Sequence, residues 1–156
     1  MTLGAIISPH DAWLMLKGLR TLQLRVERSA ASGKKVVEFL QNHPKIEKIY
    51  YPFLKENPQY KLAKKQMSNC GGMFSVLLQA KNMKQVEKFC DNAKRFLLAC
   101  SWGGYESLLF PACTLYNSQN YASSGNYLPW NLVRIYIGLE EPELLIEDLK
   151  KALEKI

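Results

Sequence analysis

Apolar residues recur at helical spacing from residue 12 to about residue 41, which predicts an amphipathic helical region. The apolar positions are Trp13, Leu16, Leu19, Leu22, Val26, Val36, Val37 and Leu40. Ser8 can cap this region, and Pro9 suits the first helical position because its missing N–H is not needed there. Gly18 and the segment 29–33 predict kinks. We therefore expect one long bent helix or two helices in series, closed by Pro44.

The remainder of the chain alternates between short apolar runs and helical patterns. Strands are predicted at 46–51, 73–79, 96–100 and 132–137, and helices at 60–67, 81–93 and from Pro142 to the C-terminus. We expect the strand at 96–100 to be buried. Because strands and helices interleave, the fold class is α/β: a two-layer domain with one small, mostly antiparallel sheet covered by helices on at least one face. An aromatic loop at 114–130 either forms a lid or packs on the domain.

Composition is that of an ordinary globular protein. The 156 residues, 47% hydrophobic and 22% charged, suit a single domain. No run approaches the roughly 20 apolar residues of a membrane helix, and the first ten residues do not resemble a signal peptide. We therefore expect a soluble, cytoplasmic protein with no membrane partner.

Charge and cysteine spacing argue against two further classes of function. The net charge is +7, but the lysines and arginines are spread along the chain, which favours a basic surface over a nucleic-acid site. Cys70, Cys90, Cys100 and Cys113 are widely spaced and lie near no histidine pattern. Reduced thiols without a metal are therefore expected.

Two features are candidates for a binding site. The stretch CSWGGYESLLF, at 100–110, interrupts apolar sequence with a polar, glycine-paired turn that serves either a site or a structural corner. In LVRIYIGLE, period-two alternation places Arg134 among apolar strand residues. Its planar fork matches a carboxylate. It either binds such a ligand, forms a structural ion pair, for example with Glu106, or faces solvent. No catalytic set is apparent.

The string GAIISPHDAWLMLKGLRTLQLRVER resembles the start of the C-terminal, small domain of the pyridoxal-phosphate-dependent Cys/Met metabolism (transsulfuration) enzymes. Lys17 stands where that family has arginine. The resemblance continues through HPKIEKIYYP, NPQYKLAKKQM, GGMFSVLL, CSWGGYESL and LVRIYIGLEEPELLIEDLKKAL, which is nearly the whole chain outside the loop at 114–130. The motif SWGGYESL is most similar to that of cystathionine β-lyases.

The resemblance implies roles for four residues. Arg134 would bind the α-carboxylate of a sulfur amino acid such as cystathionine, and Ser101 and Trp102 would line the substrate site. Cys100 occupies a position that often sets substrate preference, as a tyrosine in β-lyases and an acid in some γ-lyases, so the substrate stays open. The implied chemistry in the intact enzyme is carbon–sulfur bond cleavage with pyridoxal phosphate.

The resemblance also implies that the Schiff-base lysine and the cofactor-binding residues belong to a large domain upstream of this chain. Lys34 lies where a helix interior is expected and is not assigned that role. We therefore expect one substrate-recognition domain, with a linking helical region at 1–42 and a sheet-and-helix body at 43–156, inactive alone. Its partners would be the large domain or further copies of the chain. The alternatives are a non-catalytic interaction module or a fragment of a cystathionine γ-synthase or γ-lyase.

Overall fold

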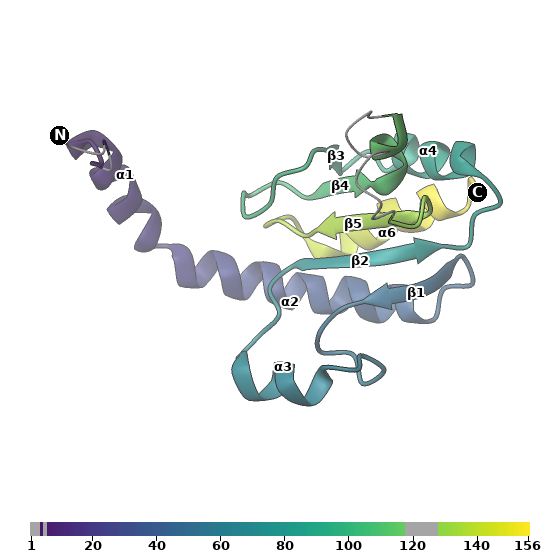
Figure 1. Ribbon diagram of the computed structural model, residues 1–156, viewed down its shortest axis with the longest axis horizontal. Helices are drawn as coiled ribbons and strands as arrows, with labels where there is room; N and C mark the ends of the chain where they lie inside the picture. The colour runs from purple at the N-terminus through teal and green to yellow at the C-terminus, as the bar shows by residue number, and fades with distance from the viewer. Residues whose placement is uncertain (1–3, 5, 118–127) are drawn as a thin grey trace.

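A computed structural model describes residue 4 and residues 6–117 and 128–156. It contains an α/β body from which a helical arm projects (Figure 1). The predicted loop at 114–130 begins with a short 3₁₀ helix, η1 (Ala112–Asn117), and most of it lies outside the described residues. Within the described part of the chain, no helix is long and apolar enough to cross a membrane.

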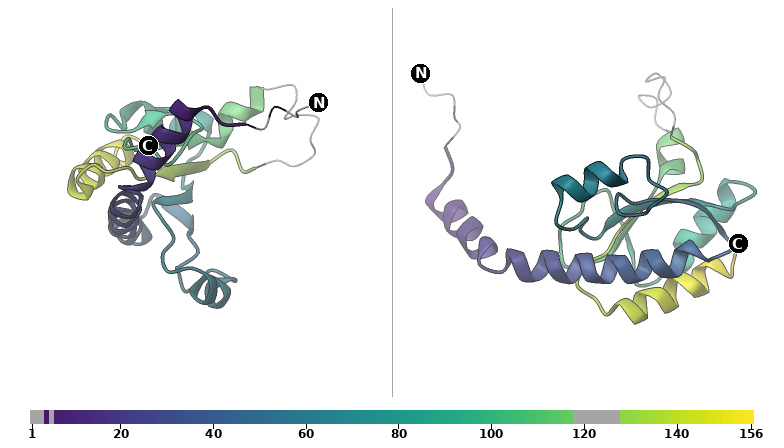
Figure 2. Two further views of the ribbon diagram at one scale, coloured as in Figure 1. Left: turned by 90° about the vertical axis from the view of Figure 1, so that its left-hand side faces the viewer. Right: turned by 90° about the horizontal axis from the view of Figure 1, so that it is seen from below.

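The N-terminal region forms two helices in series, as the apolar spacing predicts, and the arm is the first helix with the beginning of the second. Helix α1 (Pro9–Leu19) begins after Ser8, whose hydroxyl accepts a hydrogen bond from the Asp11 amide. Helix α2 (Leu22–Gln41) follows a break at residues 20 and 21, close to Gly18. Figure 2 shows α1 extending well beyond the sheet. The buried residues of α2 all lie from Ser29 onward, where the helix packs on the body.

The predicted kink at 29–33 is wrong, because α2 is continuous there. The small residues of this segment instead allow close packing on the loop before the second strand. A Cβ added to Gly33 would lie 3.0 Å from the Gly72 Cα, and one added to Gly72 would lie 2.6 Å from the carbonyl oxygen of Ile137. The Ser29 hydroxyl donates to that same carbonyl. These small residues therefore set how closely α2 approaches the sheet.

A five-stranded mixed sheet has the order β1-β2-β5-β4-β3. Its strands are β1 (Ile46–Tyr50), β2 (Met73–Leu78), β3 (Leu97–Leu98), β4 (Leu108–Pro111) and β5 (Leu132–Tyr136). All pairs are antiparallel except β3 with β4. The predicted small, mostly antiparallel sheet is thus confirmed, while β4 was not predicted as a separate strand.

Helices α2, α4 (Met83–Asn92) and α6 (Pro142–Leu153) cover one face of the sheet (Figures 1 and 2). Val133, Ile135 and Ile137 are fully buried and, because they alternate along the chain, they point into this layer together. Helix α3 (Tyr60–Gln66) lies to one side of the sheet, beyond β1. The opposite face of the sheet carries Arg134 and has no comparable helix layer among the described residues.

The strand predicted at 96–100 is much shorter than expected and is not buried. Only Leu97 and Leu98 form β3, and both are more than half exposed. The physical reason is that β3 is an edge strand with a neighbour on one side only. Apolar sequence alone does not reveal whether a strand lies at the edge of a sheet.

Candidate carboxylate-binding site

The segment 100–106 forms most of the loop that joins β3 to β4, at one end of the sheet. Gly103 has a φ of 90°, a conformation that favours glycine and turns the chain here. The Tyr136 hydroxyl donates to the carbonyl of Gly104 at 3.0 Å, and the Leu139 amide donates to the carbonyl of Tyr105 at 2.8 Å. The loop is therefore held against β5 and the residues that follow it.

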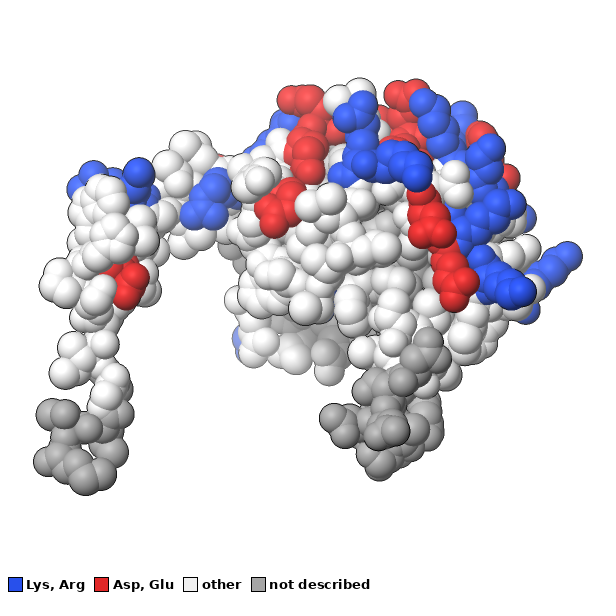
Figure 3. All heavy atoms as spheres, turned by 90° about the horizontal axis from the view of Figure 1, so that it is seen from above, with Lys and Arg blue, Asp and Glu red and all other residues white. Residues whose placement is uncertain are grey.

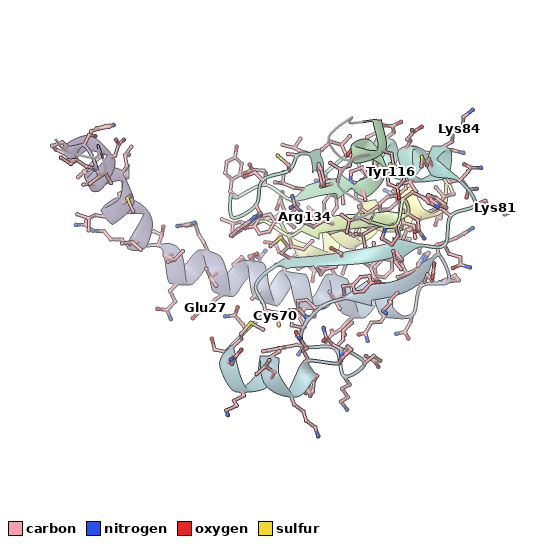
Figure 4. All side chains as sticks on the ribbon, viewed as in Figure 1. Glu27, Cys70, Lys81, Lys84, Tyr116 and Arg134 are labelled. Atoms are coloured by element: carbon pink, nitrogen blue, oxygen red, sulfur yellow. The ribbon has the colours of Figure 1, made fainter. Side chains whose placement is uncertain are left out.

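Arg134 lies on β5 beside this loop (Figure 4). Its Nη2 donates to the carbonyl of Cys100 at 2.5 Å and to that of Ser101 at 3.4 Å. Its guanidinium lies over the Phe110 ring, 5.3 Å from the ring centroid. Phe110 is the β4 partner of Arg134, so pairing in the sheet sets this stacking. Together these contacts fix the orientation of the fork.

The ion pair considered between Arg134 and Glu106 is not formed. Among the described residues, Arg134 makes no ion pair and its Nε and Nη1 have no hydrogen-bond partner. A guanidinium carries five N–H donors and matches a carboxylate through two of them. Arg134 is therefore held in place by backbone carbonyls, while much of its capacity to bind an anion is unused.

The other three predicted site residues belong to the same loop. The carbonyls of Cys100 and Ser101 contact Arg134, and both residues are exposed. The side chain of Trp102 is also exposed, at 62%. The structure thus places Arg134 and Ser101 together on the same side of the sheet.

A cavity of about 280 Å³ opens beside the loop tip. Trp102 and Gly103 form one side, Tyr136 lies next to them, and Val26 and Ser29 of α2 close the other side. Cys70 also lines it, and burial raises the pKa of this thiol, so the cavity wall carries no thiolate at neutral pH. The lining is mainly apolar, although Arg25 of α2 also borders the cavity.

Three contributors to the site were missed by sequence reasoning. Phe110 supports the Arg134 guanidinium, Tyr136 anchors the loop, and the Glu140 carboxylate accepts bonds from both the amide and the hydroxyl of Ser107, each at 2.8 Å. For Tyr136 a signal existed, because alternation along β5 places it on the same face as Arg134. For Phe110 and Glu140 the partner is distant in sequence and only the folded chain brings the two together.

The described residues do not fit pyridoxal phosphate as its complete binding site. Such a site needs a lysine amine in a pocket with phosphate-binding donors. No lysine lines the cavity beside Trp102. Lys34 lies on α2 with a 73% exposed side chain and pairs with Glu38. In the part of the chain that the structure describes, the free N–H donors of the Arg134 guanidinium suit a carboxylate instead.

Comparison with known proteins places the chain in a family over almost its whole length. The model of the family described as Cys/Met metabolism PLP-dependent enzyme matches residues 1–154. The chain is 41% identical to cystathionine gamma-lyase of Mus musculus over 157 residues, covering 98% of this chain and 39% of that protein. It is 40% identical to cystathionine beta-lyase of Lactococcus lactis over 156 residues, covering 99% and 40%.

Solved structures give the same result for the fold. The metB structure from Corynebacterium glutamicum superposes with a TM-score of 0.85 at 38% identity, covering 97% of this chain and 39% of that one. A putative O-acetylhomoserine (thiol)-lyase from Campylobacter jejuni, determined with N'-pyridoxyl-lysine-5'-monophosphate, gives 0.81 at 33% identity, covering 97% and 34%. The chain thus spans about two fifths or less of the length of these relatives.

Proposed function

Because the chain belongs to the Cys/Met metabolism PLP-dependent enzyme family, we propose that it is the substrate-recognition part of a cystathionine β-lyase-like enzyme. In this proposal Arg134 receives the α-carboxylate of a sulfur amino acid, and Ser101 and Trp102 line the place where the substrate lies. Cys100 contributes to substrate preference. The supporting observation is the Arg134 fork, which is oriented by Phe110 and two carbonyls and has no carboxylate partner among the described residues.

The family's cofactor, pyridoxal phosphate, supplies the electron sink for carbon–sulfur bond cleavage in the intact enzyme. The residues described above do not form its site, so in this proposal other parts of the enzyme hold it. The role of this chain is to bind and orient the substrate. A guanidinium fixed in advance loses less rotational freedom on binding, which leaves more of the interaction energy for the ligand.

A γ-lyase or γ-synthase is the second candidate. It is supported by the near-equal identity to the mouse γ-lyase, 41%, and the Lactococcus β-lyase, 40%. Cys100 matches neither the tyrosine nor the acid considered for that position, so this residue favours neither candidate. The β-lyase and γ-lyase candidates differ in which carbon–sulfur bond of cystathionine breaks, whereas a γ-synthase forms such a bond.

The test joins this chain to the remaining part of the Lactococcus relative, with cystathionine as substrate. We expect the fusion to release pyruvate, the product of β-cleavage, and the purified chain alone to release none and to show no absorbance of lysine-bound cofactor. Release of 2-oxobutanoate would select the γ-lyase alternative. Activity or lysine-bound cofactor in the chain alone would overturn the proposed division of roles. An inactive fusion that folds and binds the cofactor would favour the interaction module.

A further inference from the structure

Two side chains on one face of β5 bind the β3–β4 loop on either side of Trp102 and Gly103. Arg134 holds the carbonyls of Cys100 and Ser101, and Tyr136 holds the carbonyl of Gly104. The two side chains are two positions apart on a strand, so they project from the same face. The loop between them contains Trp102 and Gly103, which also form one side of the cavity.

The two anchors differ in what a bound carboxylate does to them. A guanidinium binds a carboxylate bidentately either through Nε and Nη2 or through Nη1 and Nη2, so Nη2 takes part in both arrangements. Nη2 carries two hydrogens, and Arg134 directs this atom at two carbonyls already. A bidentate carboxylate therefore takes one of these hydrogens, and the longer contact, to Ser101 at 3.4 Å, is the one it displaces.

We propose that Tyr136 is a positioning residue that keeps the 100–104 loop in place while Arg134 exchanges its carbonyl contact for the substrate carboxylate. This inference rests on the proposed role of Arg134. Tyr136 suits the task because it is 8% exposed and its hydroxyl serves Gly104, not the ligand. The Gly103 turn lies directly before the anchored carbonyl, and because glycine adopts many backbone conformations at little cost, the turn does not hold the loop by itself.

Amide order parameters from ¹⁵N relaxation of the purified chain test the proposal. L-methionine is the ligand that carries a carboxylate. L-methioninol, which lacks the carboxylate, is the matched control ligand. In the unsubstituted chain we expect residues 102–104 to stay rigid, with values near 0.85, before and after methionine is added. In Tyr136→Phe they should be lower without ligand and should fall further, below about 0.6, when methionine binds. Methioninol should leave them unchanged.

The control variant is Tyr105→Phe, which removes a hydroxyl from the same loop at a side chain that is 75% exposed. It should behave as the unsubstituted chain does. If Tyr136→Phe leaves the order parameters of 102–104 unchanged without ligand, or if Tyr105→Phe lowers them equally, the inference fails. The Nε signal of Arg134 separates this outcome from failure of the proposed function. If methionine does not shift that signal, Arg134 is not the carboxylate receptor, whatever Tyr136 does.

Discussion

At the scale of single residues, Arg134 is the side chain on which the proposed function depends most directly. Arg134→Lys keeps the positive charge but loses the planar fork. In the active fusion we expect this change to weaken the handling of amino-acid substrates by about 2–3 kcal/mol, the range for hydrogen bonds to charged groups that are left unmade. The measurement is kcat/KM for cystathionine, with thermal unfolding in parallel.

Arg28→Lys is the matched control, because Arg28 forms a surface ion pair with Glu141 at 2.9 Å and donates to the Glu140 carbonyl at 3.3 Å, and neither contact involves Arg134. It should change neither kcat/KM nor the unfolding temperature appreciably. A structural role for Arg134 predicts the reverse for Arg134→Lys: a less stable protein that handles substrate normally.

Cys100 differs from the other cysteines in exposure, which predicts selective reactivity. Burial raises the pKa of Cys90 to about 12 and also raises those of Cys70 and Cys113, so these thiols stay protonated at pH 8. Cys100 is exposed in the loop. With a thiol-reactive disulfide reagent at pH 8 we expect one fast-reacting thiol, absent in Cys100→Ser. A fast phase that persists in that variant would contradict the assignment.

At the scale of elements, the packing of α2 against the sheet depends on Gly72. An added methyl group would lie 2.6 Å from the Ile137 carbonyl oxygen and closer still to the Ser29 hydroxyl, so the backbone must shift. We expect Gly72→Ala to lower the free energy of unfolding by about 1–3 kcal/mol, as for overpacked cores. Denaturant unfolding measures this. Gly18→Ala is the control, since a Cβ there meets nothing within 4 Å, and a comparable loss in it would refute the packing argument.

The connection from α2 to β1 contains a histidine that makes stability depend on pH. Burial, followed by the charge of Lys45, lowers the pKa of His43 below its ordinary value of 6.5. The Lys150 side chain acts in the same direction, and Glu154 opposes it. Neutral His43 also accepts a hydrogen bond from the Lys45 amide at 3.2 Å, which the protonated ring cannot do.

Because the unfolded chain binds this proton more readily, the contribution of His43 to stability is present above about pH 6.5 and is lost as pH falls through the lower pKa of the folded state. His43→Asn keeps an acceptor but does not titrate. Between pH 7 and 5.5 we expect the unfolding midpoint of the unsubstituted chain to fall more steeply than that of His43→Asn. Parallel curves would contradict this.

At the scale of the whole molecule, the arm leaves apolar surface without cover. The chain exposes 10528 Å², whereas a compact monomer of 17.9 kDa exposes about 8000 Å². The large exposed apolar residues of the arm are Ile6, Ile7, Trp13, Leu14, Met15, Leu16, Leu19, Leu22, Leu24 and Val26. Figure 3 shows few charged side chains on the arm, while those of the body gather toward its helix layer.

We therefore predict that the isolated chain self-associates through the arm. The excess exposed area is larger than the roughly 800 Å² that each partner buries in a standard interface. Replacing Leu16 and Leu24 with glutamine should shift sedimentation equilibrium toward the monomer. Leu97→Gln is the control, because Leu97 is exposed at 59%, close to the 60% of Leu16, but lies on β3. A strictly monomeric chain at high concentration would contradict the prediction.

The local pattern of the sequence was sufficient for most helices and for β5. Helical spacing, the Ser8-Pro9 start and the Pro142 start are short-range signals, and strict alternation identified which side chains of β5 enter the core. The resemblance to a family, which rests on the same local motifs, implied roles for Arg134 and for the loop. Each of these depends on neighbours in the chain, which a sequence displays directly.

Only the tertiary structure decided where those elements meet. Contacts between residues distant in sequence decide four features. These are the edge position of β3, the continuous helix at Ser29–Gly33, the Phe110 ring beside the Arg134 guanidinium, and the Tyr136 hydrogen bond to the loop. The small residues of α2 could signal either flexibility or close packing, and the choice depends on whether another backbone approaches them. For the same reason the partner of the Arg134 fork, two loop carbonyls instead of Glu106, became known only from the folded chain.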